Sequence, residues 1–111
     1  MTYKDIIEIL ERINNKLMMV PHENMHNGDI IATKSLKYMN KLYVKIDNEY
    51  LMDNKRLLLN NVSIIINELY KVSSCSVKSV EHQISHIVCI YIMQLIEMLK
   101  NKQIDNFFNL F

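Results

Sequence analysis

Residues 21 to 29 read PHENMHNGD and contain the pattern His-Glu-x-x-His, which binds zinc in a class of peptidases. Histidines four residues apart share one helix face, and the glutamate between them can act as a base on metal-bound water. In this chain a proline stands directly before the pattern and an Asn-Gly pair directly after it, so any helix here is very short. Such a turn, polar on every side, has no apolar face to anchor it. The segment favours a solvated loop over a peptidase site built from His22, Glu23 and His26.

The four histidines allow a second metal arrangement. His22 with His26, and His82 with His86, form two pairs with i, i+4 spacing. Four imidazoles would converge if the first loop folded over the start of the fourth helical segment. Structural zinc sites in small domains usually include thiolates, and only Cys75 is near. The four histidines are therefore kept as an alternative metal site, and we expect no cofactor.

Other catalytic patterns are weak. Cys75 lies seven residues before His82, and no spacing rule turns this pair into a catalytic dyad. A single glycine excludes a glycine-rich phosphate loop. The second helical segment carries a row of lysines on one side: Lys34, Lys37, Lys41 and Lys45. Acidic residues follow this row, which favours a solvated face over a nucleic-acid stripe, and we expect no enzymatic activity.

Composition indicates which elements must position these residues. The 111 residues include one glycine and one proline, far fewer turn residues than a sheet-rich domain needs. Apolar residues recur at helical spacing in four segments, at about 3–20, 29–52, 55–72 and 77–100. Short connectors favour antiparallel neighbours. We predict an all-α fold with a single domain, 1–111: a compact bundle of four long helices with a short hydrophobic C-terminal helical tail.

Apolar stripes predict the core and the helix ends. The stripes are Ile6, Leu10, Ile13 and Leu17 in the first segment, Leu36, Met39, Tyr43, Ile46 and Tyr50 in the second, and Leu58, Val62, Ile65, Leu69 and Val72 in the third. Thr2 followed by Asp5 predicts the N-cap of the first helix, and Asp53 is a candidate cap for the third. The fourth segment is apolar on almost every side between Ile87 and Met93, which predicts a central helix.

Charge and hydropathy narrow the class of protein. Thirteen basic residues stand against twelve acidic ones, and this balance argues against nucleic acid as a partner. Two cysteines do not make a disulfide framework. The first residues carry charges, unlike a secretory leader. The longest apolar run, residues 87–93, is far shorter than the about 20 residues of a membrane span. We expect an intracellular, cytoplasmic protein with no membrane span.

The apolar residues exceed what four short stripes need. The chain contains eight methionines and ends in a tail with three phenylalanines. Surplus apolar faces on a small domain often form a groove or a dimer surface, and methionine suits adaptable grooves. We predict that the fourth segment contacts a protein partner together with the tail residues Ile104, Phe107, Phe108 and Phe111. The alternative is a fuller core, with the tail folded back as a lid.

Two stretches resemble the poxviral Bcl-2-like proteins. Ile46 to Leu69, IDNEYLMDNKRLLLNNVSIIINEL, is similar to the acidic-polar turn that opens a buried helix in an apoptosis inhibitor of this family. Ile90 to Phe111, IYIMQLIEMLKNKQIDNFFNLF, resembles the closing helices of the shorter members that restrain innate signalling. The resemblance implies a helical bundle that binds a host helix or signalling protein, often as a dimer. The family's Asn-Trp-Gly-Arg signature is absent, so no groove residue is carried over.

The sequence thus predicts a non-enzymatic helical protein-interaction module. Through the resemblance, it predicts a viral modulator that binds a host apoptotic or innate-signalling protein through apolar helical faces. Two alternatives stay open. One is a small structural or assembly subunit that self-associates as a homodimer or larger oligomer, and the other is a metal-binding helical protein using the HENMH segment. Bacteriocin-immunity proteins, which are four-helix bundles of similar length, are an analogy at the level of the fold alone.

Overall fold

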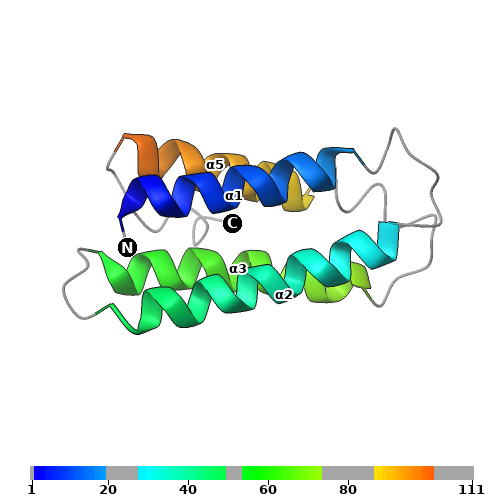
Figure 1. The fold of residues 1–111 in the computed structure, drawn as a ribbon, viewed down its shortest axis with the longest axis horizontal. Helices are drawn as coiled ribbons and strands as arrows, with labels where there is room; N and C mark the ends of the chain where they lie inside the picture. Colours follow the sequence, from blue (N-terminus) through cyan, green and yellow to red (C-terminus); the bar gives the residue numbers. More distant parts are fainter. Residues whose placement is uncertain (1, 20–27, 50–53, 74–86, 102–111) are drawn as a thin grey trace.

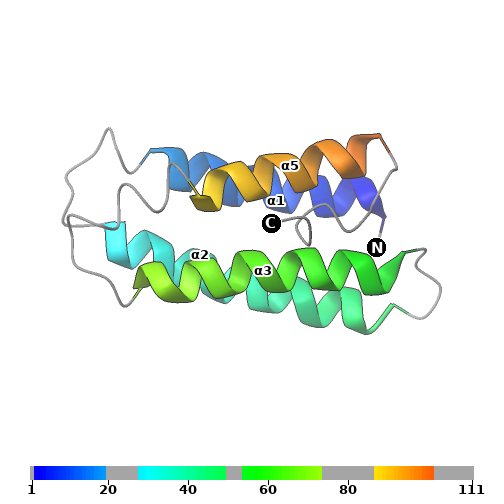
Figure 2. The same ribbon diagram turned by 180° about the vertical axis from the view of Figure 1, so that it is seen from behind.

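Four antiparallel helices form the described part of the chain, which in this computed structural model comprises residues 2–19, 28–49, 54–73 and 87–101. The helices are α1 (Tyr3–Met18), α2 (Gly28–Asp47), α3 (Lys55–Ser73) and α5 (Cys89–Lys100). They run alternately up and down in two layers, with α1 beside α5 and α2 beside α3 (Figure 1). Figure 2 shows the same layers from behind, with α5 and α3 nearer the viewer. The predicted all-α bundle of four helices is confirmed, and the predicted tail, residues 104–111, lies outside the described residues.

The start of α1 is a capping box. The Thr2 hydroxyl accepts a hydrogen bond from the Asp5 amide at 3.3 Å, and the Thr2 amide donates to the Asp5 carboxylate at 2.9 Å. The two bonds satisfy donors that the first helical turn leaves without partners. The pKa of Asp5 is lowered, chiefly by the hydrogen bond from the Thr2 backbone and to a smaller extent by hydrogen bonding with the Thr2 side chain. The N-cap predicted from Thr2 and Asp5 is confirmed.

The hydrophobic core lies between the two layers, and all four described helices contribute buried side chains to it. Its fully or nearly fully buried aliphatic side chains include Ile6, Leu10, Ile13 and Leu17 of α1, Met39, Leu42 and Ile46 of α2, Leu58, Val62, Ile65 and Leu69 of α3, and Ile92, Leu95 and Leu99 of α5. In each helix these positions are three or four residues apart, so they share one face. Within the described ranges, no helix combines the length and hydropathy that crossing a bilayer requires.

A hydrogen bond from one lysine joins the start of α3 to the end of α2, and the residue before α3 has a left-handed backbone. Asn54 has a φ of 56°, in the left-handed region that asparagine tolerates better than most residues with a side chain. Its carbonyl accepts a hydrogen bond from the Leu58 amide at 2.9 Å in the first turn of α3. The Lys55 ammonium donates to the carbonyl of Asp47, the last residue of α2. A cation at this point also interacts favourably with the negative end of the α2 dipole. The cap predicted at Asp53 lies outside the described residues.

Helix α5 packs mainly against α1 and leaves one side exposed. Ile90 is 44% exposed and Met93 is 52% exposed, although both belong to the apolar run that predicted a central helix. That prediction is wrong for this face of α5. A helix of a two-layer bundle has close neighbours on part of its surface only, so some of the apolar side chains of α5 reach solvent.

A buried asparagine gives a first testable prediction. The side chain of Asn14 donates to the Met18 sulfur at 3.4 Å, but its oxygen accepts no hydrogen bond from the described residues, and the residue is 6% exposed. Because a buried polar atom without a partner is destabilising, Asn14→Leu is expected to raise the free energy of unfolding by about 1 kcal/mol and the melting temperature by about 4 °C. Differential scanning calorimetry measures both.

Asn60→Leu is the control, because Asn60 is exposed on α3 and its replacement tests helix propensity alone. A melting temperature of Asn14→Leu at or below that of Asn60→Leu would show that the Asn14 oxygen has no energetic cost.

Candidate functional site

A groove with a volume of about 740 Å³ lies between α1 and α2, and we call it the α1–α2 groove. Its lining from α1 and the C-cap residue of that helix is Ile9, Arg12, Ile13, Asn15, Lys16 and Met19. Its lining from α2 is Ile31, Lys34, Ser35, Tyr38, Lys41, Leu42 and Lys45. Both sets follow helical spacing of three or four residues, so each helix contributes one continuous stripe. The groove is therefore a property of two facing helix surfaces rather than of a loop.

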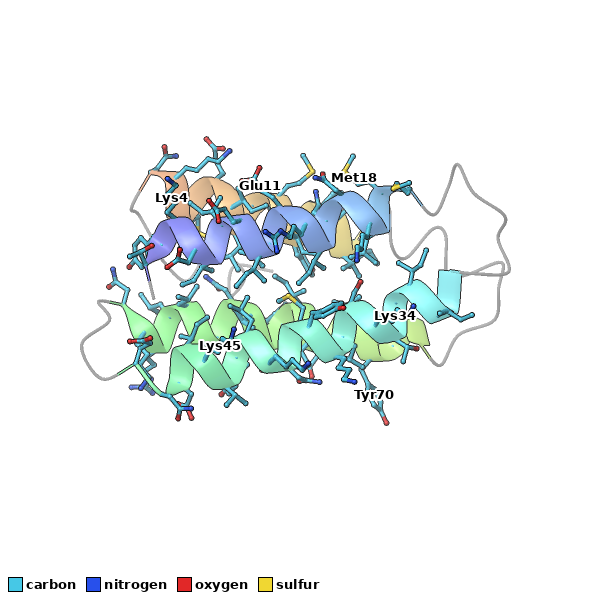
Figure 3. All side chains as sticks on the ribbon, in the orientation of Figure 1. Lys4, Glu11, Met18, Lys34, Lys45 and Tyr70 are labelled. Carbon is cyan, nitrogen blue, oxygen red and sulfur yellow. The ribbon has the colours of Figure 1, made fainter. Side chains whose placement is uncertain are left out.

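Labelled side chains in Figure 3 show how α1 and α2 are oriented relative to the groove. Figure 3 shows Lys4, Glu11 and Met18 on the edge of α1 that is turned away from α2. The same view shows Lys34 and Lys45 towards opposite ends of α2. Lysines thus accompany the groove along most of the length of α2.

The floor of the groove is largely apolar. Ile13 and Leu42 are 4% and 1% exposed, and they belong to the hydrophobic core. Ile9 and Ile31 are only partly buried, so they offer apolar surface to a ligand. Ser35 is also buried in this lining and adds a hydroxyl group. Covering such a floor is favourable by about 25 cal/mol for each Å² of apolar surface removed from water.

The rim of the groove is basic. It carries Arg12 and Lys16 from α1, and Lys34, Lys41 and Lys45 from α2, all of them exposed. The described residues that line the groove include no carboxylate. Within the described ranges none of these five cations is held in an ion pair. Among the described residues, no carboxylate neutralises the positive charge of this rim.

Tyr38 stands between cations from both helices. The residue is 46% exposed, and the ammonium groups of Lys16 and Lys41 lie over its ring, at 5.8 and 5.9 Å from the ring centroid. At exposed sites such a cation–π contact is worth about 0.5–1 kcal/mol. Lys16 comes from α1 and Lys41 from α2, so Tyr38 links the two rims. An exposed aromatic side chain in this position is a natural anchor for a bound partner.

The titratable side chains in the described lining of the groove are one tyrosine and five cations. Of the described residues, those that line it include no histidine, cysteine, aspartate or glutamate that could act as a general base. Elsewhere in the described ranges, no three such side chains gather closely enough to hold a metal ion. The Cys89 thiol is 3% exposed, and its burial raises its pKa to about 11, which makes it a poor nucleophile.

Of the site residues proposed from the sequence, those of the metal alternative, the loop thiol and the tail lie outside the described residues, whereas residues 87–100 of the fourth segment are described. The residues outside the described ranges are His22, Glu23, His26, His82 and His86 for the metal alternative, Cys75, and Ile104, Phe107, Phe108 and Phe111 for partner binding. The lysine row is described, and all four of its members are exposed. Three of them, Lys34, Lys41 and Lys45, line the α1–α2 groove, whereas Lys37 does not. These predictions about metal and tail therefore stay predictions.

Sequence reasoning missed the contribution of α1 to this groove. Arg12 and Lys16 are about one helical turn apart, and they lie three residues after the apolar residues Ile9 and Ile13 respectively. This pattern was a usable signal for a basic edge next to an apolar stripe. The sequence pattern alone did not show that α1 and α2 are neighbours along this edge.

In comparisons with family models, curated proteins and solved structures, nothing matches this chain.

Proposed function

We propose that this chain is a non-enzymatic helical module that binds a protein partner in the α1–α2 groove. The observation that carries the proposal is the combination of a partly exposed apolar floor with an exposed aromatic residue, Tyr38, at its edge. Interfaces take most of their binding energy from a few such apolar and aromatic anchors, with charged groups around them. The resemblance to poxviral Bcl-2-like proteins supports a finer proposal, in which the partner is a host apoptotic or innate-signalling protein.

Tyr38→Ala tests this proposal. A phage-displayed library of random peptides is selected on the immobilised protein, and the affinity of purified peptides is then measured by fluorescence anisotropy. The selected peptides are expected to compete with one another and to bind Tyr38→Ala about tenfold more weakly, because the variant loses an aromatic anchor. Circular dichroism checks that the variant keeps its helices.

The matched control is Tyr70→Ala. Tyr70 is an exposed tyrosine of α3, 68% exposed, and it does not line the groove. This variant is expected to bind the peptides as the unchanged protein does. Peptides that bind both variants with unchanged affinity would place the binding surface elsewhere. If analytical ultracentrifugation shows a dimer that is lost in Tyr38→Ala, the groove binds a second copy of this chain rather than a different protein.

A further inference from the structure

Positive charge is concentrated at the α1–α2 groove far beyond the average of the chain. The whole sequence has a net charge of +1, with 13 basic and 12 acidic residues. The described groove lining holds five of the basic residues and no acidic one. Like charges held together raise the local potential and attract anionic groups. A ligand of this groove therefore carries negative charge on the parts that meet the rim.

The floor requires more than charge from the ligand. Ile9 and Ile31 are partly exposed apolar side chains between the two basic rims, and Ile13 and Leu42 lie beneath them. A purely ionic ligand would leave this apolar surface in contact with water. A ligand that places apolar side chains on the floor and carboxylates on both rims matches the whole lining. The groove thus fits an amphipathic anionic segment.

The walls of the groove indicate that the segment is helical. Both walls are α-helices, so their backbone amides and carbonyls are already paired and offer no edge to which a strand could add. A bound helix satisfies its own backbone and presents only side chains to the groove. The lining extends from Ile9 to Met19 on α1 and from Ile31 to Lys45 on α2, or about 15 and 21 Å of helix. This length corresponds to about three to four turns of a ligand helix.

We infer that the α1–α2 groove binds an acidic amphipathic helix of about three to four turns. The inference rests on the proposed function and names the class of partner. The apolar stripe of the ligand lies on the floor beside Tyr38, and its glutamates or aspartates meet Arg12 and Lys16 on one rim. Lys34, Lys41 and Lys45 meet the carboxylates on the other rim.

Three designed helical peptides test the charge and the amphipathicity together. They share apolar residues at i, i+4, i+7 and i+11, and the positions beside this stripe are all glutamate, all glutamine or all lysine. Fluorescence anisotropy of the labelled peptides measures their affinity. The glutamate peptide is expected to bind about tenfold more tightly than the glutamine peptide, and the lysine peptide more weakly than both. Because salt screens exposed charges, the advantage of glutamate over glutamine should shrink as the ionic strength rises.

A charge reversal in the rim supplies the decisive variant. In Lys34→Glu/Lys41→Glu the preference is expected to invert, so that the lysine peptide binds more tightly than the glutamate peptide. The control is Lys4→Glu/Lys37→Glu, which changes the net charge equally at two exposed lysines outside the groove. This control should keep the preference for glutamate. Circular dichroism shows whether both variants retain their helices.

Other outcomes separate this inference from the proposed function. Equal affinity for the glutamate and glutamine peptides would overturn the acidic partner while leaving the groove as a protein-binding site. Failure of all three peptides, when phage-selected peptides still depend on Tyr38, would overturn the helical partner alone. Tighter binding of a single-stranded oligonucleotide or of anionic lipid vesicles than of the glutamate peptide would assign the basic rim to a different class of ligand. If phage selection also yields no peptide that depends on Tyr38, both proposals fail.

Discussion

Replacing Leu10 by alanine is expected to lower the free energy of unfolding by about 2–5 kcal/mol. Leu10 is 0% exposed in the middle of α1, within the core cluster shared by all four described helices. Its truncation removes apolar contacts and leaves a cavity that the close-packed surroundings fill only in part. Since the unfolding free energy of natural domains is about 5–15 kcal/mol, this one change would remove a large share of it. Urea denaturation followed by circular dichroism measures the loss.

Glu11→Ala is the control for this experiment. Glu11 is the next residue of α1, is exposed, and points away from α2 (Figure 3). Its replacement is expected to change the free energy of unfolding by less than about 0.5 kcal/mol. A loss in Leu10→Ala no larger than that in Glu11→Ala would contradict the packing of α1 against the rest of the bundle.

The stripes of α1 and α3 were predictable from sequence. Ile6, Leu10, Ile13 and Leu17 are all buried, as are the described members of the α3 stripe. Each of these helices buries one continuous face, so regular apolar spacing is a sufficient signal. The ends were less accurate, since α1 ends at Met18 and α2 at Asp47, both short of the predicted limits.

The buried face of α2 was predicted less well. Met39 and Ile46 are buried as expected, but Leu36 and Tyr43 are only half-buried, and Leu42 is 1% exposed. Helix α2 packs mainly against α3 and also contacts α1, so its buried surface is wider than one stripe. Periodicity alone does not show which of two adjacent apolar residues, such as Leu42 and Tyr43, is more deeply buried. Their burial depends on which neighbour lies on which side.

The groove needed tertiary information for a similar reason. The lysines of α2 were visible as a row in the sequence, but a row on one exposed helix predicts only a solvated face. Helix α1 runs antiparallel beside α2 (Figure 1). The groove arises because this arrangement brings Arg12 and Lys16 into one lining with three lysines of that row. The contact of Lys16 with the Tyr38 ring joins residues 22 positions apart in the sequence. No local pattern indicates such a pairing.

The stability of the protein is expected to fall between about pH 9 and pH 11 because of Cys89. Burial raises the pKa of the Cys89 thiol from 9.0 to about 11. Above pH 9 the unfolded chain releases the thiol proton while the folded chain retains it, so rising pH favours the unfolded state. The stabilisation by the neutral thiol is complete below pH 9 and is lost as pH rises through the folded pKa. A pKa difference of this size corresponds to about 2–3 kcal/mol.

Cys89→Ala isolates this effect. Lysines and tyrosines ionise in the same range, so the informative quantity is the difference in unfolding free energy between the unchanged protein and Cys89→Ala at each pH. Truncation of a buried side chain costs the variant stability at neutral pH, and this cost is independent of thiol ionisation. The difference between the two proteins should therefore be largest at pH 8 and shrink by about 2–3 kcal/mol towards pH 11. Chemical denaturation at a series of pH values gives it directly. A difference that stays constant across the series would contradict the raised pKa, because it would mean that the thiol ionises as readily in the folded protein, where Cys89 belongs to the core cluster, as in the unfolded chain.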